Sequence, residues 1–211
     1  ARNLALGHAS GTWLTFPDPD DVLSDDYFAQ VASAIDPDDP PAMLSTRLLL
    51  WFEDDAEDPL RDVHALAGRF HEGRVTKSLV QSPSWVQPHV TSGFMQRERI
   101  RDAGLMFPTD LRLRFEDGAF ASYYLLGFED PTVTFVPEAA YHYRQRSDNS
   151  STIQTSAANP RKYTDTISHG FLPVIDEALR VRGAVPRWLQ NLFLYDQFWI
   201  LRSSQTPAVR N

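Results

Sequence analysis

Cysteine is absent from this sequence of 211 residues, so it can form neither a disulfide framework nor a thiolate metal site. Long hydrophobic runs are absent as well. The longest apolar stretches, such as residues 48–52, fall far below the roughly 18 residues that a membrane-spanning helix needs. The opening residues do not show the charged-then-apolar pattern of a signal segment. Together these absences predict a protein of a reducing compartment, and we expect it to be cytoplasmic.

Positive charge is scarce in the first part of the chain. The whole sequence has 28 acidic and 20 basic residues, which gives a net charge of −8. Residues 1–60 carry 13 of those acidic residues but only two basic ones, Arg2 and Arg47. Nucleic-acid-binding proteins usually carry a basic stripe with interleaved aromatic residues, and no such stripe is present. We therefore expect no nucleic-acid partner. The acidic part instead favours a cation held between carboxylates, with an anion nearby.

The remaining composition is that of an ordinary globular protein, with 42% hydrophobic and 23% charged residues. Runs rich in β-formers alternate with amphipathic helical patterns in the first part, which predicts an α/β fold. Strands are expected over 12–16, 44–52, 75–80 and 133–136. From about residue 160 the pattern is helical only, with helices expected over 163–182, bent near Pro173, and over 187–202. Ser24 is a good N-cap for a helix whose apolar face contains Tyr27 and Val31.

The most specific pattern in the sequence is Asp18-Pro19-Asp20-Asp21, directly after the first predicted strand. A DxD pattern at this point places two carboxylates on a turn at the carboxyl edge of the sheet, where open α/β folds bind ligands. Hard divalent cations often bind through one or two carboxylates together with substrate phosphates. The alternative is an acidic turn whose carboxylates only cap the following helix.

Glu116 and Asp117 form a second acidic pair, at the expected start of a helix. A carboxylate at this position can act as a general base if it lies within reach of a hydroxyl proton. The alternative is that the pair interacts only with the helix dipole.

Two arginines, Arg144 and Arg146, follow the last predicted strand. Arginines in this position can bind a diphosphate through charge-assisted hydrogen bonds. The alternative is a polar surface loop. His142, just before them, is interpreted as a packing or hydrogen-bonding residue rather than a metal ligand.

An aromatic stripe runs along the last predicted helix. It comprises Trp188, Leu192, Phe193, Tyr195, Phe198 and Trp199. Such a stripe is typical of core, of a contact with a neighbouring domain, or of a helix that lies on a membrane surface.

The order of these segments resembles the middle of a family 2 glycosyltransferase of the GT-A fold. Residues 1–3 (Ala-Arg-Asn) and 11–21 are similar to the family's "ARN…A-G-x-(apolar)-F-x-D-x-D-D" pattern, and 26–28 to its acidic-Tyr-Phe segment. Further matches are 92–98 with the acceptor-side segment, Phe107 and 115–117 with "F…ED", and Tyr143-Arg144 with the closing "Y-R". The tail resembles bacterial cell-envelope members of the teichoic-acid type.

The resemblance implies a mixed GT-A-like sheet flanked by helices over residues 1–155, followed by a helical extension over 156–211. The family's nucleotide-binding half would precede Ala1, so we expect a C-terminal part of the domain that on its own has little activity. The last helix would contact a neighbouring domain or the inner face of the membrane.

The implied activity is inverting transfer of a sugar from a nucleotide-diphosphate sugar to a glycan or polyol-phosphate acceptor of the cell envelope. Asp18 and Asp20 would hold Mg²⁺ or Mn²⁺ on the diphosphate. Asp21 would support them on the donor side.

The resemblance also implies roles for the other candidate residues. Asp117 would be the base, and Glu116 would orient it. Arg2 and Asn3 would contact the substrate, and Arg144 and Arg146 would meet the diphosphate or an anionic acceptor.

Two other functions remain open at this stage. Residues 18–22 also match the start of a haloacid-dehalogenase-type phosphatase, with 53–55 as its second acidic motif. That fold needs a lysine between the two motifs, and Lys77 and Lys162 both come later. The other alternative is a non-catalytic cation-binding or interaction module, a degenerate or truncated transferase domain. Binding of a nucleotide-diphosphate sugar would distinguish the enzyme from this module.

Overall fold

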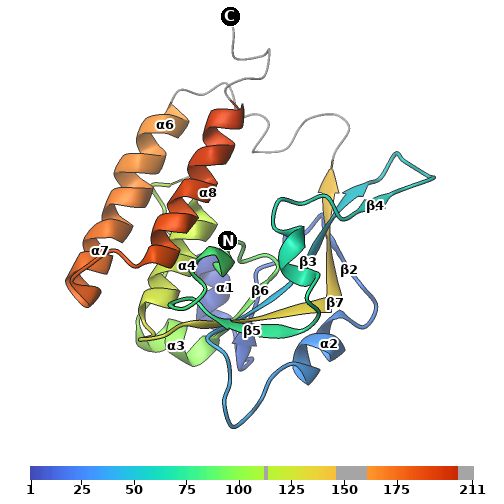
Figure 1. Cartoon of the computed structure of the whole chain (residues 1–211), viewed down its shortest axis with the longest axis horizontal. Coiled ribbons are helices and arrows are strands. Elements are labelled where there is room, and N and C mark those ends of the chain that lie inside the picture. Colours follow the sequence, from blue (N-terminus) through green and yellow to red (C-terminus); the bar gives the residue numbers. More distant parts are fainter. Residues whose placement is uncertain (112–113, 146–160, 204–211) are drawn as a thin grey trace, which may run out of the picture.

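The computed structural model describes residues 1–111, 114–145 and 161–203 (Figure 1). Within them, a mixed seven-stranded sheet has the order β1-β6-β3-β7-β2, with β4 added on β3 and β5 on β7. The strands are β1 (Trp13–Leu14), β2 (Val22–Leu23), β3 (Met43–Phe52), β4 (Leu60–Arg61), β5 (Val75–Ser78), β6 (Gly93–Gln96) and β7 (Thr132–Gln145). The predicted α/β class is therefore confirmed.

The long strands β3 and β7 form the centre of the sheet and pair in parallel, whereas the other described pairs are antiparallel. Their register runs from Met43 opposite Val133 to Phe52 opposite Gln145. It shifts once, where residues 137–139 of β7 have no partner on β3. Pro137 explains the shift, because proline has no N–H to donate to the ladder.

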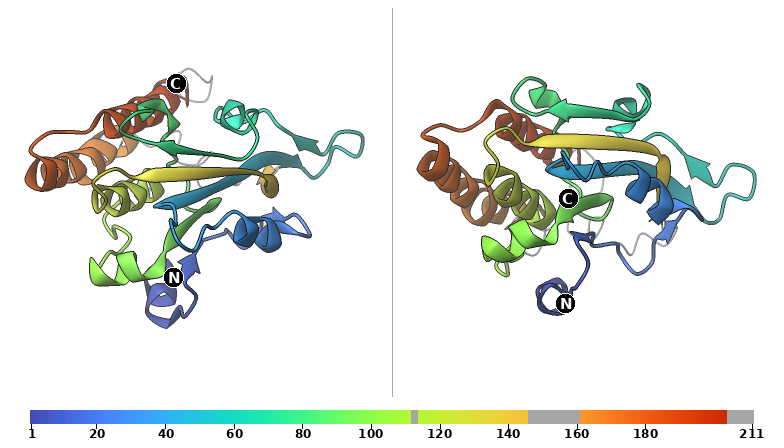
Figure 2. Two further views of the ribbon diagram at one scale, coloured as in Figure 1. Left: turned by 60° about the horizontal axis from the view of Figure 1, so that its bottom comes forward. Right: turned by 90° about the horizontal axis from the view of Figure 1, so that it is seen from below.

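Helices cover both faces of the sheet (Figure 2). They are α1 (Arg2–His8), α2 (Tyr27–Ser33), α3 (Arg97–Asp102), α4 (Glu116–Leu126), α6 (Arg161–Asp165), α7 (Leu172–Arg182) and α8 (Arg187–Ser203). Two 3₁₀ turns, η1 (Ala67–Phe70) and η2 (Pro83–Trp85), and a π-helical turn, η3 (Thr166–Phe171), complete the elements. The helices α4, α7 and α8 lie side by side at one end of the sheet. None of the described helices combines the length and the apolar character that crossing a bilayer requires.

Successive side chains of a strand point to opposite faces of the sheet, so the central strands contribute to two cores. Met43 and Phe135 belong to the larger core, whereas their neighbours Leu44 and Val136 belong to the smaller one beneath α2. The larger core also takes in buried side chains of the C-terminal helices, namely Phe171, Val174, Ala178, Trp188, Leu189 and Leu192. The C-terminal helices therefore pack on the same core as the sheet. The predicted boundary between residues 155 and 156 falls outside the described residues.

The strand expected over 12–16 is shorter than predicted. Only Trp13 and Leu14 pair with β6, because the chain then turns and the Phe16 amide donates to the Val90 carbonyl. The prediction of Ser24 as an N-cap is wrong. Its hydroxyl accepts a hydrogen bond from the Ala140 amide, which ties β2 to β7, and the helix begins only at Tyr27.

Candidate active site

Arg2 joins the two acidic motifs that the sequence places about 100 residues apart. Its Nη2 lies 2.9 Å from Asp18 Oδ1, and its Nη1 lies 2.5 Å from Asp117 Oδ1. The three side chains are 28%, 40% and 24% exposed, respectively, so the cluster is open to solvent on one side. One guanidinium therefore brings Asp18 and Asp117 together.

The loop of residues 18–21 is fixed to the end of β7 by a tyrosine. The Tyr141 hydroxyl accepts a hydrogen bond from the Asp18 amide over 3.0 Å and donates one to Asp21 Oδ2 over 2.5 Å. The Arg144 amide donates a further bond of 2.8 Å to Asp21 Oδ1. Burial raises the pKa of Asp21, while these two hydrogen bonds lower it. Asp21 thus holds the loop at the carboxyl ends of β3 and β7, the edge where the sequence predicts a ligand.

Glu116 and Asp117 open α4, where the helix dipole favours negative charge. The residue before them, Phe115, has φ 70°, a left-handed conformation that is uncommon outside glycine. Burial raises the pKa of Asp117 to about 7, against the opposing effect of the Arg2 charge. Burial also raises the pKa of Glu116. Asp117 is thus poised to exchange a proton near neutral pH, which is a property of a general base.

Asn3 uses both ends of its side-chain amide on one backbone position. Its Nδ2 donates to the Phe107 carbonyl over 3.0 Å, and its Oδ1 accepts from the Phe107 amide over 2.8 Å. The Arg2 guanidinium lies over the Phe107 ring, 5.3 Å from its centroid. These contacts hold α1 in place and aim Arg2 at the carboxylates. Contact of Asn3 with a substrate stays a prediction.

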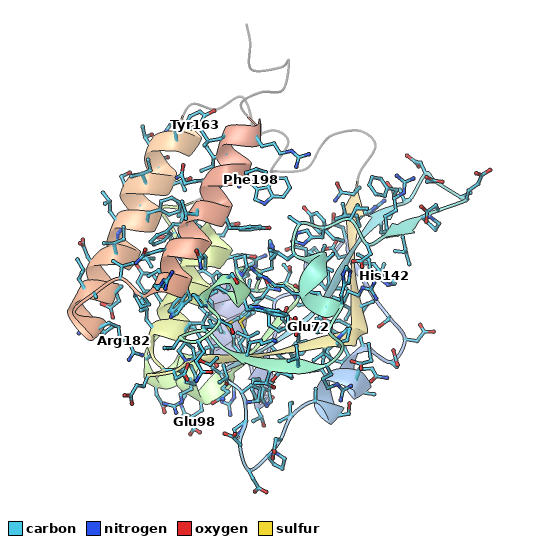
Figure 3. All side chains as sticks on the ribbon, viewed as in Figure 1. Glu72, Glu98, His142, Tyr163, Arg182 and Phe198 are labelled. Atoms are coloured by element: carbon cyan, nitrogen blue, oxygen red, sulfur yellow. The ribbon has the colours of Figure 1, made fainter. Side chains whose placement is uncertain are left out.

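Arg144 is already paired in the structure. Its Nε donates to Glu53 Oε2 over 2.6 Å, and its guanidinium lies 5.7 Å from the Trp51 ring centroid. Any diphosphate or anionic acceptor would therefore share Arg144 with Glu53. Arg146 lies outside the described residues, so its predicted role stays untested. His142, which is labelled in Figure 3, lies on β7 opposite Val22, and burial lowers its pKa.

The carboxylates of Asp18 and Asp20 could hold a hard cation only together with other ligands, such as the phosphates of a substrate. Over the described residues, no group of three or more His, Asp or Glu side chains could hold a metal ion. Asp18 and Asp20 supply carboxylate oxygens of the kind that Mg²⁺ and Mn²⁺ prefer, and the Asp18 contact with Arg2 uses Oδ1 and not Oδ2. The residues present therefore fit a cation that also binds substrate phosphates. Sharing of one ion by Asp18 and Asp20 stays a prediction.

Sequence reasoning missed Glu53, the partner of Arg144, and Tyr141, the partner of Asp21. It also missed the ion pair between Arg114, just before Phe115, and Asp196. A partial signal existed for Tyr141, because alternate residues of a strand share a face and Tyr141 is followed two residues later by Tyr143. Arg114 lies two residues before Glu116, but nothing local indicates its partner, Asp196 on α8.

A mixed sheet with an acidic loop at its strand ends and an acidic helix start beside it is the arrangement expected of a GT-A glycosyltransferase domain. No family model matches the sequence. The chain is 26% identical, over 214 residues, to the minor teichoic acid biosynthesis protein GgaB of Bacillus subtilis (strain 168). The match covers 100% of this chain but only 23% of the length of that relative.

Among solved structures, S. aureus TarS has the same fold. The crystal structure of TarS 1–349 in complex with UDP-GlcNAc matches 96% of this chain and 62% of that chain, with a TM-score of 0.51 and 18% identity. The structure of S. aureus TarS matches 96% of this chain and 37% of that chain, with a TM-score of 0.50 and 18% identity. The chain thus has the fold of S. aureus TarS, and the predicted fold is confirmed, as is the resemblance to cell-envelope proteins of the teichoic-acid type.

Proposed function

We propose that this chain forms the catalytic and acceptor-side part of a glycosyltransferase. It would transfer a sugar from a nucleotide-diphosphate sugar to a glycan or polyol-phosphate acceptor in cell-envelope synthesis. One observation carries the proposal: the Arg2 guanidinium contacts both Asp18, in the donor-side loop, and Asp117, the predicted base. The relative named for teichoic acid biosynthesis and the fold shared with TarS support it.

In the proposed reaction, Asp117 takes the proton of the acceptor hydroxyl. The hydroxyl oxygen forms a bond to the anomeric carbon, and the bond from that carbon to the diphosphate oxygen breaks with its electron pair. Attack from the face opposite the leaving group inverts the anomeric configuration. A pKa near neutrality suits Asp117 to this role, because it can be ionised before the reaction and protonated after it.

Arg2 and Glu116 set the state of this base. The Arg2 cation favours the ionised form of Asp117, and burial favours the neutral form. The neighbouring Glu116 carboxylate also raises the pKa of Asp117. The balance keeps Asp117 able to lose and regain a proton in the same pH range.

Asp18 and Asp20 would hold Mg²⁺ or Mn²⁺ together with the donor diphosphate. When bound, such an ion neutralises the negative charge that develops on the leaving group. Asp21 and Tyr141 hold the loop that presents these two carboxylates. The site would work on the cytoplasmic side of the membrane, where nucleotide-activated donors are made.

The test uses the intact protein with UDP-GlcNAc and other nucleotide-diphosphate sugars, with and without Mn²⁺. Asp117→Asn should lower transfer by about 10²- to 10⁴-fold and leave donor affinity nearly unchanged, because a base acts only as the transition state forms. Asp20→Ala should weaken donor binding in the presence of Mn²⁺. Asp25→Asn, at an exposed acidic residue of the same segment, is the matched control.

Two outcomes would contradict the proposal. Equal loss of donor affinity in Asp117→Asn and Asp20→Ala would remove Asp117 from the role of base. Binding of a protein partner without any binding of a nucleotide-diphosphate sugar would favour the non-catalytic module.

A further inference from the structure

We propose that the C-terminal helices position residues 114–117, which we call the catalytic turn. In this proposal Asp196 and Gly170 are positioning residues for Asp117. This inference rests on the proposed function, since it concerns the residues that carry the proposed base. Two independent contacts join the C-terminal helices to the residues just before Glu116. One is an ion pair, and the other is an aromatic clamp.

The ion pair joins α8 to the start of the turn. Arg114 Nη2 lies 3.1 Å from Asp196 Oδ1, and the two side chains are only 13% and 14% exposed. Arg114 Nε and Asp196 Oδ2 are buried and have no hydrogen-bond partner in the described part of the chain. Each charge therefore depends on the other, because removing one leaves its partner buried and uncompensated.

The Asp196 charge also acts on Glu116, the first residue of the acidic pair. Its negative charge raises the pKa of Glu116, although the two residues lie on different helices. Electrostatic effects of this kind between charges need proximity, because solvent screens distant pairs. Helix α8 therefore brings a charge to the proposed active site as well as a structural contact.

The aromatic clamp holds the Phe115 ring between two glycines. A Cβ atom added to Gly118 of α4 would lie 2.6 Å from Phe115 Cε2, and one added to Gly170 would lie 2.9 Å from Phe115 Cδ1. The Phe171 ring packs edge-on at 4.7 Å between centroids, and the Phe193 ring of α8 lies at 5.9 Å. The ring is thus enclosed by α4 on one side and by the C-terminal helices on the other.

The π-helical turn η3 contains both Gly170 and Phe171. Such turns are rare and often occur at functional sites. Here the turn brings two consecutive residues against the same Phe115 ring. Pro173 follows two residues after Phe171 in α7, which continues the helical backbone of η3, since Phe171 and Leu172 both have right-handed helical dihedral angles.

The clamp fixes the backbone that carries the base. Phe115 has the left-handed φ of 70°, and its carbonyl accepts the first hydrogen bond of α4, from the Ala119 amide over 2.8 Å. A residue in this conformation persists only where its surroundings hold it, and such residues concentrate at active sites. The contacts of Phe115 and Arg114 supply that restraint, so they determine where Asp117 meets Arg2.

The experiment compares Asp196→Asn and Gly170→Ala with Arg182→Gln in the intact protein. Arg182 is the matched control because it also joins the C-terminal helices to α4, by donating to the Leu126 carbonyl over 3.0 Å at the far end of that helix. Figure 3 labels Arg182 at the end of α7, away from Tyr163 near the start of α6. Asp196→Asn preserves the shape of the side chain, so it tests the contact even if Gly170→Ala does not fold.

Three measurements are needed, namely steady-state kinetics, amide hydrogen exchange and an NMR titration of Asp117. We expect kcat to fall by about 10²-fold in both variants, with the donor KM within about twofold, because small displacements of a reacting group cost this much. Exchange of the amides of residues 116–119 should accelerate by about tenfold relative to the end of α4. In Gly170→Ala, the pKa of Asp117 should fall toward its ordinary value because burial is what raises it. Arg182→Gln should change none of these.

A lower melting temperature with unchanged kcat, exchange and Asp117 pKa would overturn the inference and leave a merely structural contact. If the unmodified protein transfers no sugar, the proposed function fails. In that case hydrogen exchange and the Asp117 titration still decide whether the helices position the turn.

Discussion

Asp117 keeps a pKa of about 7 although its Oδ1 lies 2.5 Å from Arg2 Nη1. A cation at this distance alone would lower the pKa of a carboxyl group by one to three units. Burial of Asp117 outweighs the cation, and the neighbouring carboxylate of Glu116 adds to the effect of burial. A carboxyl group whose pKa is raised by burial although a cation lies beside it marks a candidate functional site. A carboxylate that served only in a structural ion pair would be more stable fully ionised.

Arg2→Gln should raise the pKa of Asp117 above its present value, because the charge that opposes burial is lost. The acid limb of the profile of kcat/KM against pH should move to higher pH in parallel. An NMR titration of the Asp117 carboxyl group and the pH profile measure the two shifts independently. Arg101→Gln, which removes an exposed arginine from the last turn of α3, is the control. A downward shift in Arg2→Gln would mean that burial is not the main cause.

Asp117→Asn should make the protein more stable at pH 8. The folded-state pKa of about 7 lies above the ordinary value of 3.8, so the folded state binds more protons between these two values. The stability that this group contributes is therefore present below about pH 4 and is lost as the pH rises through 7. The gain at pH 8 should be about 1–3 kcal/mol, with little difference near pH 4. Urea denaturation at both pH values measures it, and an equal gain at both would contradict the assignment.

Tyr141→Phe should loosen the donor-side loop. The substitution leaves the Asp18 amide and Asp21 Oδ2 without their shared partner, which should cost about 1–3 kcal/mol of stability. Donor affinity should fall as well, because the loop that presents Asp18 is less restrained. Tyr123→Phe is the control, since Tyr123 is half-buried on α4 away from this loop. Isothermal calorimetry and denaturation measure the two effects, and equal effects in both variants would count against a specific role of Tyr141.

Gly93→Ala should destabilise the sheet, whereas Gly7→Ala should not. A Cβ atom at Gly93 would lie 2.3 Å from Met43 Cε and 2.8 Å from the His89 carbonyl oxygen, and the backbone oxygen cannot easily move. The expected loss is about 1–3 kcal/mol. At Gly7, in α1, nothing lies within 4 Å of the added atom, so alanine should gain about 0.5–1 kcal/mol from its higher helix propensity. Thermal unfolding of the two variants provides the comparison.

The local elements of this fold could be predicted from the sequence where their pattern was strong. The central strand over 43–52 and the helices after residue 160 follow from continuous apolar and amphipathic patterns. The length of β7 could not be predicted, because Pro137 interrupts the pattern and only pairing with β3 carries the strand on to Gln145. The pair Val22–Leu23 forms a strand only because β7 lies beside it.

The sequence indicated the acidic residues of the candidate site but not the residues that hold them in place. Order and spacing indicated Asp18 and Asp117, since each follows or precedes a recognisable element. The partners Glu53, Tyr141 and Asp196 act over long separations in the chain, and single-sequence patterns contain no signal for such contacts. Arg2 belonged to a recognised motif, but its position between two carboxylates depends on how α1 packs on Phe107.

The parallel pairing of β3 with β7 has a consequence for how the protein folds. Its partners, from Met43 with Val133 onward, are about 90 residues apart in the chain, so a large loop must close before the pair is formed. Folding rates fall as contacting residues become more distant in sequence. Since Tyr141 of β7 anchors the loop of Asp18 and Asp21, that loop cannot reach its final shape until the slow strand pairing is complete. A refolding experiment should therefore recover helical circular dichroism first and the ability to bind a nucleotide-diphosphate sugar last.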